Sequence, residues 1–381
     1  MRLAFVCTEM LPSPAIRGGA IQILIDGVTP VIAQNHELTI FSVADPDLPT
    51  REKCHGVEYI RFPNQNYSNS VAEFLSNNEP FDVIHVFNRP RNVYAYKQAS
   101  PKTRFVLSLH NEMFHPKKLS DEASLRCIES LETIMTVSDY ISSTVTSRFP
   151  LATEKMKTVY SGVDLNCYCP SWSAGDKRTA LREKYGLINK KVILFVGRLS
   201  VKKGPHILVQ ALQSILPKHP DAVLVIVGSR WFGDNSINEY VQTLYKLSEP
   251  VHDKIVFTGF VSPFDIPDHY VIGDVFVCCS QWQEPLARVH YEAMAAGLPI
   301  ISTNRGGNTE VITHLYNGIV IDDYSNPAAF AKALDSILSC PGMADILAKR
   351  GREIAEKRFS FTRVAEDLQN IYQEAFTKEN E

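Results

Sequence analysis

Residues 191–216, KVILFVGRLSVKKGPHILVQALQSIL, contain the pattern on which the fold depends. A short apolar run (191–196) leads into a loop with glycine at both ends, and a segment with helical spacing of its apolar residues (205–216) follows. Short apolar runs and helix-period segments alternate in this way along nearly the whole chain. The alternation predicts an α/β protein whose parallel sheets carry helices on both faces.

The alternation falls into two series separated by a polar stretch at 164–189. The predicted strands lie at 2–7, 37–42, 57–61, 82–86, 105–109 and 133–137, and then at 191–196, 222–227, 255–258, 274–278, 299–302 and 318–321. We therefore predict two doubly wound, Rossmann-like domains, 1–165 and 166–360, with a last helix in 361–381 that packs back on the first domain. Ligands of such sheets bind beyond the carboxyl ends of the strands.

The composition excludes several classes of protein. The 381 residues are 45% hydrophobic, and 39 Lys and Arg against 42 Asp and Glu give a net charge of −3. These values argue against disorder and against binding nucleic acid through a basic surface. Apolar runs such as 222–227 are far shorter than the roughly 20 residues of a membrane span. With no signal-peptide pattern and only eight cysteines, the chain is expected to be soluble and cytoplasmic.

The loop at 197–204, GRLSVKKG, is the first candidate for chemistry. Glycines let the backbone approach a ligand, and Arg198 and Lys203 beside a helix N-terminus would suit a diphosphate. A solvated basic turn is the alternative interpretation. Neither Gly-x-Gly-x-x-Gly nor a Walker loop occurs, so dinucleotide oxidoreductases and P-loop kinases lose their main supporting signal.

Two acids stand out in residues 280–299, SQWQEPLARVHYEAMAAGLP. Helical geometry places Glu284 and Glu292 about 80° apart around the axis and about 12 Å along it, so both can face the same end of the sheet and bind hydroxyls of a long ligand. An ordinary pair of exposed acids is the alternative. The loop at 304–310, NRGGNTE, adds Gly306 and Gly307, whose backbone N–H groups are expected to be free at another helix start.

Taken together, these motifs resemble those of the retaining GT-B glycosyltransferases of glycosyltransferase family 4. The resemblance rests on the loop at 197–204, on Glu-x₇-Glu running into EAMAAGLP, and on GGNTEV at 306–311. It extends through the first half as RGGA at 17–20, DVIH at 82–85, LHN at 109–111, VS at 137–138 and SGVD at 161–164. It therefore spans nearly the whole chain, in the family's order.

The resemblance implies a fold and an activity. The fold would be GT-B, with the two domains facing each other across a cleft. The activity would be transfer of a hexose from a nucleotide diphosphate sugar, most simply a UDP-sugar, to an acceptor with retention of anomeric configuration. No metal or other cofactor would be required, because Arg198 and Lys203 would neutralise the departing diphosphate.

The resemblance also implies roles for individual residues. The catalytic candidates are Glu284, which would bind the donor sugar's hydroxyls, and His110, which would lie beside the reacting carbon. Glu292 would bind the ribose. The glycines Gly18 and Gly19 would let a first-domain loop close over the phosphates, and Gly306 and Gly307 would complete the cradle of the donor.

A narrower resemblance concerns the biological setting. GSRWFGDN at 228–235 and SQWQEPLARVHYE at 280–292 are similar to segments of spore coat proteins of bacilli. It implies formation of spore coat or cell-surface glycans, a place in the cytoplasm or the spore coat, and other coat proteins as partners. The acceptor stays open between a glycan, a peptide and a small molecule. A nucleotide-sugar epimerase and a structural coat protein without turnover are the alternative functions.

Three further features have a structural alternative. Asp45 and Asp47 form an Asp-x-Asp that could hold a metal, but a turn at Pro46 explains them more simply. The histidines His85 and His290 fit a protein core as well as a ligand site. The segment 88–92, NRPRN, follows a predicted strand, and its two arginines could bind a phosphate or carboxylate of the acceptor or form a solvated turn.

Overall fold

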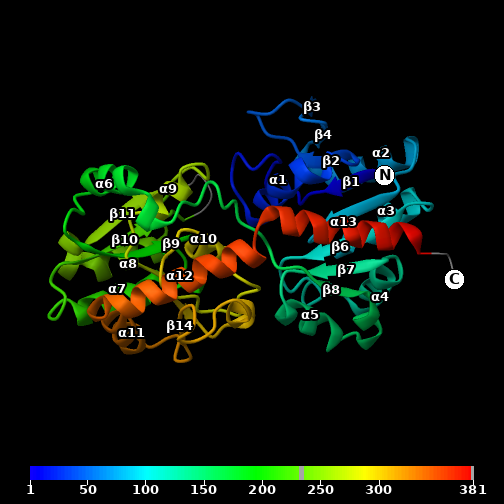
Figure 1. The fold of residues 1–381 in the computed structure, drawn as a ribbon. Coiled ribbons are helices and arrows are strands. Elements are labelled where there is room, and N and C mark those ends of the chain that lie inside the picture. The colour runs from blue at the N-terminus through cyan, green and yellow to red at the C-terminus, as the bar shows by residue number, and fades with distance from the viewer. Residues whose placement is uncertain (231–235, 379–381) are drawn as a thin grey trace. The chain divides into compact units, whose positions relative to one another are not determined.

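The chain forms two compact units in the computed structural model, which describes residues 1–230 and 236–378 (Figure 1). Unit 1 comprises Met1–Gly162 and the C-terminal segment from Phe361, and unit 2 comprises Val163–Ser360. The sequence placed this boundary at 165/166. In the structure the boundary lies earlier, between Gly162 and Val163. The Val163 N–H donates to the Phe359 carbonyl at 2.8 Å, and this hydrogen bond attaches Val163 to unit 2.

Unit 1 is an α/β unit. Its strands are β1 (Arg2–Val6), β2 (Glu37–Val43), β3 (Arg51–Cys54), β4 (Val57–Phe62), β5 (Val83–Phe87), β6 (Arg104–Leu109), β7 (Thr133–Thr136) and β8 (Met156–Thr158). Its α-helices are α1 (Ala20–Ile32), α2 (Tyr67–Asn77), α3 (Pro90–Ala99), α4 (Asp121–Glu129), α5 (Asp139–Thr146) and α13 (Phe361–Thr377).

Unit 2 repeats the same alternation. Its strands are β9 (Lys191–Val196), β10 (Ala222–Val227), β11 (Ile255–Gly259), β12 (Val275–Cys278), β13 (Ile300–Thr303) and β14 (Ile319–Ile321). Its α-helices are α6 (Gly175–Lys184), α7 (Pro205–Ile215), α8 (Glu239–Ser248), α9 (Ile266–Tyr270), α10 (Val289–Ala295), α11 (Pro327–Ser339) and α12 (Pro341–Arg358).

The sheet of unit 1 has the strand order β3-β4-β2-β1-β5-β6-β7-β8, and its pairs are parallel except β3 with β4. From β1 the chain moves outward to β2, and it later returns to add β5 on the other side. The order of the strands therefore reverses between β1 and β5. In open α/β sheets the crevice at such a reversal is where ligands bind.

Both faces of this sheet are buried. Successive residues of β1 point to opposite faces, so Ala4 and Val6 join one hydrophobic core while Leu3 and Phe5 join another. Helices α2, α3, α4 and α5 contribute to the first core, and α1 and α13 to the second. A sheet covered on both sides needs continuous apolar strands, which is why the strands were recognisable in the sequence.

Helix α13 packs on unit 1, as the sequence predicted. It lies against α1, β5 and β6, and its residues Val364, Leu368 and Tyr372 are buried there. The close contact depends on Gly27 in α1, because a Cβ at that position would lie 2.4 Å from the ring of Phe361. The end of the chain thereby completes the first unit rather than the second.

The sequence did not reveal two edge strands of unit 1. Strand β3 has the polar sequence REKC and pairs with β4 through a tight turn at His55 and Gly56, both with positive φ. Two positive φ values are typical of a two-residue hairpin, but His-Gly is a weak signal for one. Strand β8 is only three residues long. Edge strands lack the continuous apolar sequence of central strands.

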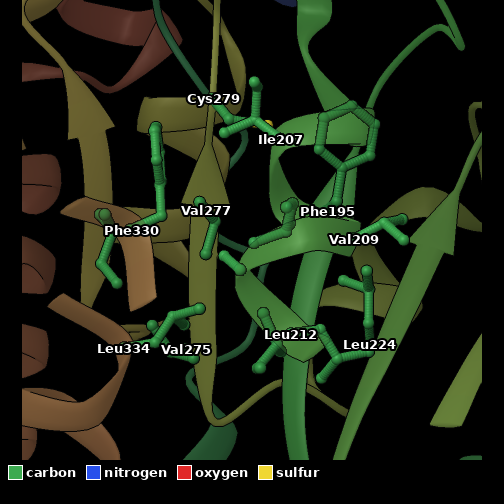
Figure 2. Close-up of a cluster of buried hydrophobic side chains, with 14 of the residues drawn as sticks. Phe195, Ile207, Val209, Leu212, Leu224, Val275, Val277, Cys279, Phe330 and Leu334 are labelled. Atoms are coloured by element: carbon green, nitrogen blue, oxygen red, sulfur yellow. The ribbon is translucent and has the colours of Figure 1, made fainter. Parts of the chain in front are cut away.

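The sheet of unit 2 has the order β11-β10-β9-β12-β13-β14 with parallel pairs throughout the described residues. Figure 2 shows part of its core, where side chains of β9, β10 and β12 meet those of α7 and α11. Phe195, Leu212 and Leu334 are among the buried residues of this cluster. The strand order reverses between β9 and β12, so the loops after these two strands mark the expected ligand crevice.

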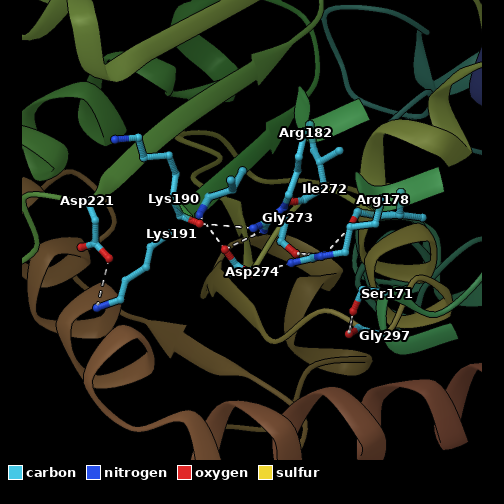
Figure 3. Close-up of polar contacts among 12 residues, drawn as sticks. Ser171, Arg178, Arg182, Lys190, Lys191, Asp221, Ile272, Gly273, Asp274 and Gly297 are labelled. Carbon is cyan, nitrogen blue, oxygen red and sulfur yellow. Dashed lines mark hydrogen bonds and ion pairs between the residues drawn. The ribbon is translucent and has the colours of Figure 1, made fainter. Parts of the chain in front are cut away.

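The charged helix α6 belongs to unit 2, as predicted for residues 166–360. Figure 3 shows Arg178 and Arg182 converging on Asp274, at 2.5 Å and 2.8 Å from its two carboxylate oxygens. The Val192 N–H at the start of β9 donates to the same carboxylate at 2.7 Å. Asp274 therefore connects α6 to the amino-terminal edge of the sheet, which is the edge away from the crevice.

Two other expectations concern membrane spans and the motif at 228–235. Within residues 1–230 and 236–378, no helix is long and apolar enough to cross a bilayer. Trp231 and Phe232, which belong to the motif of the narrower resemblance, lie outside the described residues.

Candidate active site

The loops after β9 and β12 meet at the strand-order reversal of unit 2. The contact is close at Gly204, which has φ +72° and begins α7. A Cβ on Gly204 would lie 2.1 Å from the carbonyl oxygen of Cys279, so only glycine fits. This approach also brings the Gln281 N–H to the Lys202 carbonyl at 2.8 Å. The backbone contacts place the side chains of the two loops side by side.

Lys203 and Glu284 form an ion pair at this point. Lys203 Nζ lies 2.8 Å from Glu284 Oε1 and 2.9 Å from Oε2. The Ser280 hydroxyl and the Trp282 indole N–H both donate to Oε2, each at 2.7 Å. The Glu284 side chain is only 6% exposed. A buried carboxylate with four hydrogen bonds is rigidly oriented, and its charge acts in a poorly screened environment.

The charges around Glu284 are coupled. Burial alone would raise the pKa of Glu284, but the charge and hydrogen bonds of Lys203, together with Ser280 and Trp282, lower it below its ordinary value. Glu284 is thus ionised at neutral pH. Burial lowers the pKa of the half-buried Arg198, and the negative charge of Glu284 opposes that shift. Arg198, Lys203 and Glu284 therefore belong to one electrostatic cluster.

Glu292 has different partners. It lies in α10, is 6% exposed, and accepts a hydrogen bond from the Tyr270 hydroxyl at 2.9 Å. Arg288, one turn earlier, approaches its other oxygen at 3.5 Å. The carboxylate is therefore a buried polar group with defined orientation, which corrects the alternative of an exposed acidic pair. Glu284 is equally buried, for the reasons given above.

Gly306 and Gly307 contact the backbone of Glu284. A Cβ on Gly306, which has φ +56°, would lie 2.0 Å from the Glu284 carbonyl oxygen. The Gly307 N–H donates to that carbonyl at 2.9 Å, and the Gly306 N–H donates to Gln283 Oε1 at 2.7 Å. The expectation of free N–H groups here was wrong, because both donors are engaged. The glycines instead permit the loop after β13 to support Glu284.

The predicted residues of unit 1 lie at the carboxyl ends of its strands. Gly18 and Gly19 have φ values of +78° and +103° and form the turn that precedes α1. A Cβ on Gly19 would lie 2.5 Å from Gln22 Oε1 and 2.6 Å from Leu11 Cδ1. The positive φ values favour glycine at both positions of this loop after β1, and the close contacts leave no room for a side chain at Gly19.

His110 follows β6 directly. Its backbone N–H donates to Asn88 Oδ1 at 3.0 Å, and its Nε2 lies 3.3 Å from the Ser108 hydroxyl. Its ring is stacked near Phe87, with 6.1 Å between the ring centroids. These contacts hold the imidazole at the carboxyl edge of the sheet of unit 1.

The other two histidines are core residues. His85 and His290 are 1% and 0% exposed, and burial lowers their pKa values to about 3 and about 4. His85 Nδ1 lies 2.7 Å from the Tyr372 hydroxyl, and His290 Nε2 lies 2.7 Å from the Ser302 hydroxyl. Both imidazoles are neutral and have structural roles, in agreement with the interpretation that these histidines belong to the protein core.

The Asp-x-Asp segment has a cationic partner of its own. Arg17 donates to Asp45 at 2.9 Å and to Asp47 at 2.5 Å. Among the described residues no group of three or more His, Cys, Asp or Glu side chains is arranged to hold a metal ion. Asp45 and Asp47 therefore fix the loop that contains Gly18.

Several site residues were missed in the sequence. Ser280, Trp282 and Gln283 lie within four positions of Glu284, so their proximity was a usable signal. Tyr270 contacts Glu292 across 22 positions, and no local pattern indicates that contact. Arg288 lies four positions before Glu292 in the same helical segment, so the helical spacing was a usable signal for their contact.

Comparison with known families gives two adjoining matches. Residues 29–166 match Glycosyltransferase Family 4, and residues 177–354 match Glycosyl transferases group 1. The two matches follow the two units of the structure.

Two relatives from Bacillus subtilis (strain 168) are similar over nearly their whole length. A protein named as a glycosyltransferase, YtcC, is 52% identical over 100% of this chain and 94% of its own. Spore coat protein SA is 50% identical over 98% of this chain and 99% of its own.

Solved structures share the fold at low sequence identity. Anabaena HepE in complex with UDP superimposes with a TM-score of 0.79 at 22% identity, covering 98% of this chain and 100% of that one. Sucrose-phosphate synthase of Thermosynechococcus elongatus gives a TM-score of 0.80 at 19% identity, covering 99% of each chain. The predicted GT-B fold is thereby confirmed, and with full-length relatives at 52% and 50% identity the chain belongs to the glycosyltransferase family that combines family 4 and group 1 segments.

Proposed function

We propose that the protein transfers a hexose from a UDP-sugar to an acceptor with retention of anomeric configuration and without a metal ion. The observation that carries this proposal is the Lys203–Glu284 pair at the strand-order reversal of unit 2. A buried ion pair contributes little net stability compared with apolar packing. Charged groups placed in a ligand crevice despite that cost are typical of functional sites.

Lys203 and Arg198 are proposed to bind the diphosphate. The ammonium group of Lys203 has three N–H donors. The two carboxylate oxygens of Glu284 accept two of these hydrogen bonds, which leaves one donor for a phosphate oxygen. The guanidinium of Arg198 can bind phosphate oxygens in pairs. Two fixed cations supply the positive charge that stabilises the diphosphate as it leaves, so the reaction needs no divalent cation.

Glu284 and Glu292 are proposed to bind hydroxyl groups of the donor, Glu284 on the sugar and Glu292 on the ribose. In the transfer step the acceptor oxygen bonds to the anomeric carbon while the bond from that carbon to the diphosphate oxygen breaks. The acceptor proton passes to the departing diphosphate, so no nucleophile from the protein is needed. The negative charge of Glu284 favours the positive charge that develops on the sugar.

His110, Gly18 and Gly19 are proposed to contribute from unit 1. The glycines would let the loop after β1 approach the phosphates, and His110 would lie beside the reacting sugar. Gly306 and Gly307 act on the donor through the backbone of Glu284, which they support.

The spore coat is the proposed biological setting. Its support is the 50% identity with spore coat protein SA over 98% of this chain. The acceptor would then be a glycan or protein of the coat or cell surface, and other coat proteins would be partners.

The decisive experiment incubates the protein with UDP-, GDP- and ADP-hexoses and measures nucleotide release and sugar transfer separately. We expect UDP release coupled to transfer, an unchanged rate in EDTA, and a product whose anomeric configuration matches that of the donor by NMR. An epimerised nucleotide sugar without transfer would indicate an epimerase instead. No turnover of any donor by the folded protein would indicate a structural coat protein.

A further inference from the structure

A second candidate site lies in unit 1, at the point where the order of its strands reverses. A pocket of about 550 Å³ opens there, within the size range of small-molecule sites. Its walls come from the segments that follow four parallel strands, β4, β1, β5 and β6. The lining residues include Glu9, Asn64, Arg89, Arg91, Lys117 and Lys118.

The pocket carries an excess of positive charge. Four cationic side chains, Arg89, Arg91, Lys117 and Lys118, line it against one carboxylate, that of Glu9. Arg89 Nε lies 2.6 Å and 3.0 Å from the two oxygens of Glu9, so these two charges neutralise each other.

Three cations of the pocket lack such a partner. Arg91 donates to the Lys118 carbonyl at 2.8 Å, which leaves most of its N–H groups available. Within the described parts of the chain, no carboxylate forms an ion pair with Arg91, Lys117 or Lys118. Uncompensated cations that face one pocket favour an anionic ligand.

The remaining polar groups suit hydroxyls. The pocket is also lined by the amides Asn64, Gln65, Asn66, Asn69 and Asn92. An amide both donates and accepts, as a sugar hydroxyl does, whereas a phosphate or carboxylate alone needs only donors. Glu9 is also an acceptor: burial would raise its pKa, but the hydrogen bonds and charge of Arg89 lower it, so it stays ionised.

The wall of the pocket is fixed before any ligand arrives. Arg148 donates to the carbonyls of Phe114 and Leu119 and to Asp121, which holds the loop after β6 in place. Asn64 donates to the Glu9 carbonyl at 2.6 Å and connects the segments after β4 and β1. Ordered walls lower the entropic cost of binding.

We propose that this pocket binds a sugar that carries a phosphate or carboxylate group, with the anion on Arg91, Lys117 and Lys118 and the hydroxyls on the amides and Glu9. That this anionic sugar is the acceptor of the transfer reaction rests on the proposed function. The hypothesis drawn from the segment 88–92 thereby changes: Arg89 is engaged with Glu9, and Arg91 acts with two lysines that the sequence did not connect to it.

The test compares glucose 6-phosphate, glucuronic acid, glucose and inorganic phosphate as ligands of the full chain, by NMR titration. We expect the wild type to bind at least one anionic sugar about tenfold or more tightly than glucose, as charge-assisted hydrogen bonds provide. The double substitution Arg91→Gln and Lys118→Gln should abolish that preference. The anionic sugar that binds more tightly shows whether the pocket prefers a phosphate or a carboxylate.

The matched control is the double substitution Lys53→Gln and Lys102→Gln, which removes the same charge from exposed positions of unit 1 outside the pocket. It should retain the preference. Melting temperatures establish that both double variants are folded. If the pocket variant does not fold, Lys117→Gln, a substitution at an exposed position of the pocket, replaces it in the test. Equal binding of glucose and both anionic sugars, unchanged preference in the folded pocket variant, or phosphate binding as tight as that of the anionic sugars would overturn the proposal.

The two proposals fail separately. If the wild type prefers anionic sugars but turns over no nucleotide sugar, the pocket is confirmed as a binding site and the transferase function is wrong. If it releases UDP and transfers sugar but shows no such preference, the transferase function holds and the pocket proposal is wrong.

Discussion

Lys203 Nζ and Glu284 Oε1 are 2.8 Å apart although 81 positions separate the two residues in the sequence. They follow β9 and β12, the neighbouring strands between which the order of the sheet of unit 2 reverses. In unit 1 the Arg89–Glu9 pair follows β5 and β1, the corresponding strands of the other sheet, with Nε 2.6 Å from Oε2. Each unit therefore carries an arginine or lysine paired with a glutamate where its sheet can receive a ligand.

Glu284→Gln should lower turnover on the order of 10²–10³-fold, the usual effect of losing one preorganised electrostatic group. The amide retains the shape and some hydrogen bonds but not the negative charge that favours the developing positive sugar. UDP affinity should change little, because Arg198 and Lys203 are the proposed diphosphate ligands. Calorimetry with UDP and transfer rates separate the two effects. Glu353→Gln, exposed on α12, is the control, and near-normal turnover in Glu284→Gln would remove Glu284 from the mechanism.

Lys203→Met should weaken UDP binding about tenfold or more and destabilise the protein on the order of 3 kcal/mol, because it leaves the Glu284 charge buried without its cation. The pKa of Glu284 is lowered in the native state, so the stability from this pair is complete above pH 4.5 and is lost as the pH falls further. The difference between variant and wild type should shrink in acid. Urea unfolding at pH 7 and pH 4 measures it. The control Lys202→Met removes an exposed neighbouring charge, and equal losses in both variants would contradict the prediction.

Asp26→Asn should stabilise the protein above pH 6 by about 3 kcal/mol and have no such effect below pH 4. Burial raises the pKa of Asp26 from 3.8 to about 6, although its Oδ2 accepts a hydrogen bond from the Ala15 N–H at 2.7 Å. The native state therefore binds this proton more tightly than the unfolded chain, and native stability falls as the pH rises from 3.8 to about 6. Urea unfolding of both proteins across this range gives the two curves. Parallel curves would show that Asp26 does not titrate in this way.

Gly27→Ala should destabilise unit 1 by about 1–3 kcal/mol, because the new methyl group would overlap the ring of Phe361 and displace the start of α13. Faster proteolysis within 361–378 should accompany the loss. Gly175→Ala is the matched control, since nothing lies within 4 Å of a Cβ at that helical position. If both variants are cut and unfold like the wild type, the docking of α13 does not depend on Gly27.

The sequence alone determined the fold class, the two-unit division and most central strands. Their apolar runs are continuous because both faces of each sheet are buried. Burial on both faces therefore produces a local sequence pattern that can be recognised without the structure. The edge strand β3 was not predicted, because its residues REKC are mostly exposed and form no apolar run. The loops of the candidate site were also recognisable, because glycine and charged residues after an apolar strand form a local pattern.

Tertiary structure alone decided how those loops act on one another. The sequence presented Lys203 as a phosphate ligand and Glu284 as a sugar ligand, and only the packing of Gly204 against Cys279 shows that they form one ion pair. It presented Gly306 as a free N–H donor, whereas the fold uses it to approach the Glu284 carbonyl. Contacts across tens of residues depend on which strands lie next to each other, and a local pattern of side chains contains no information on that order.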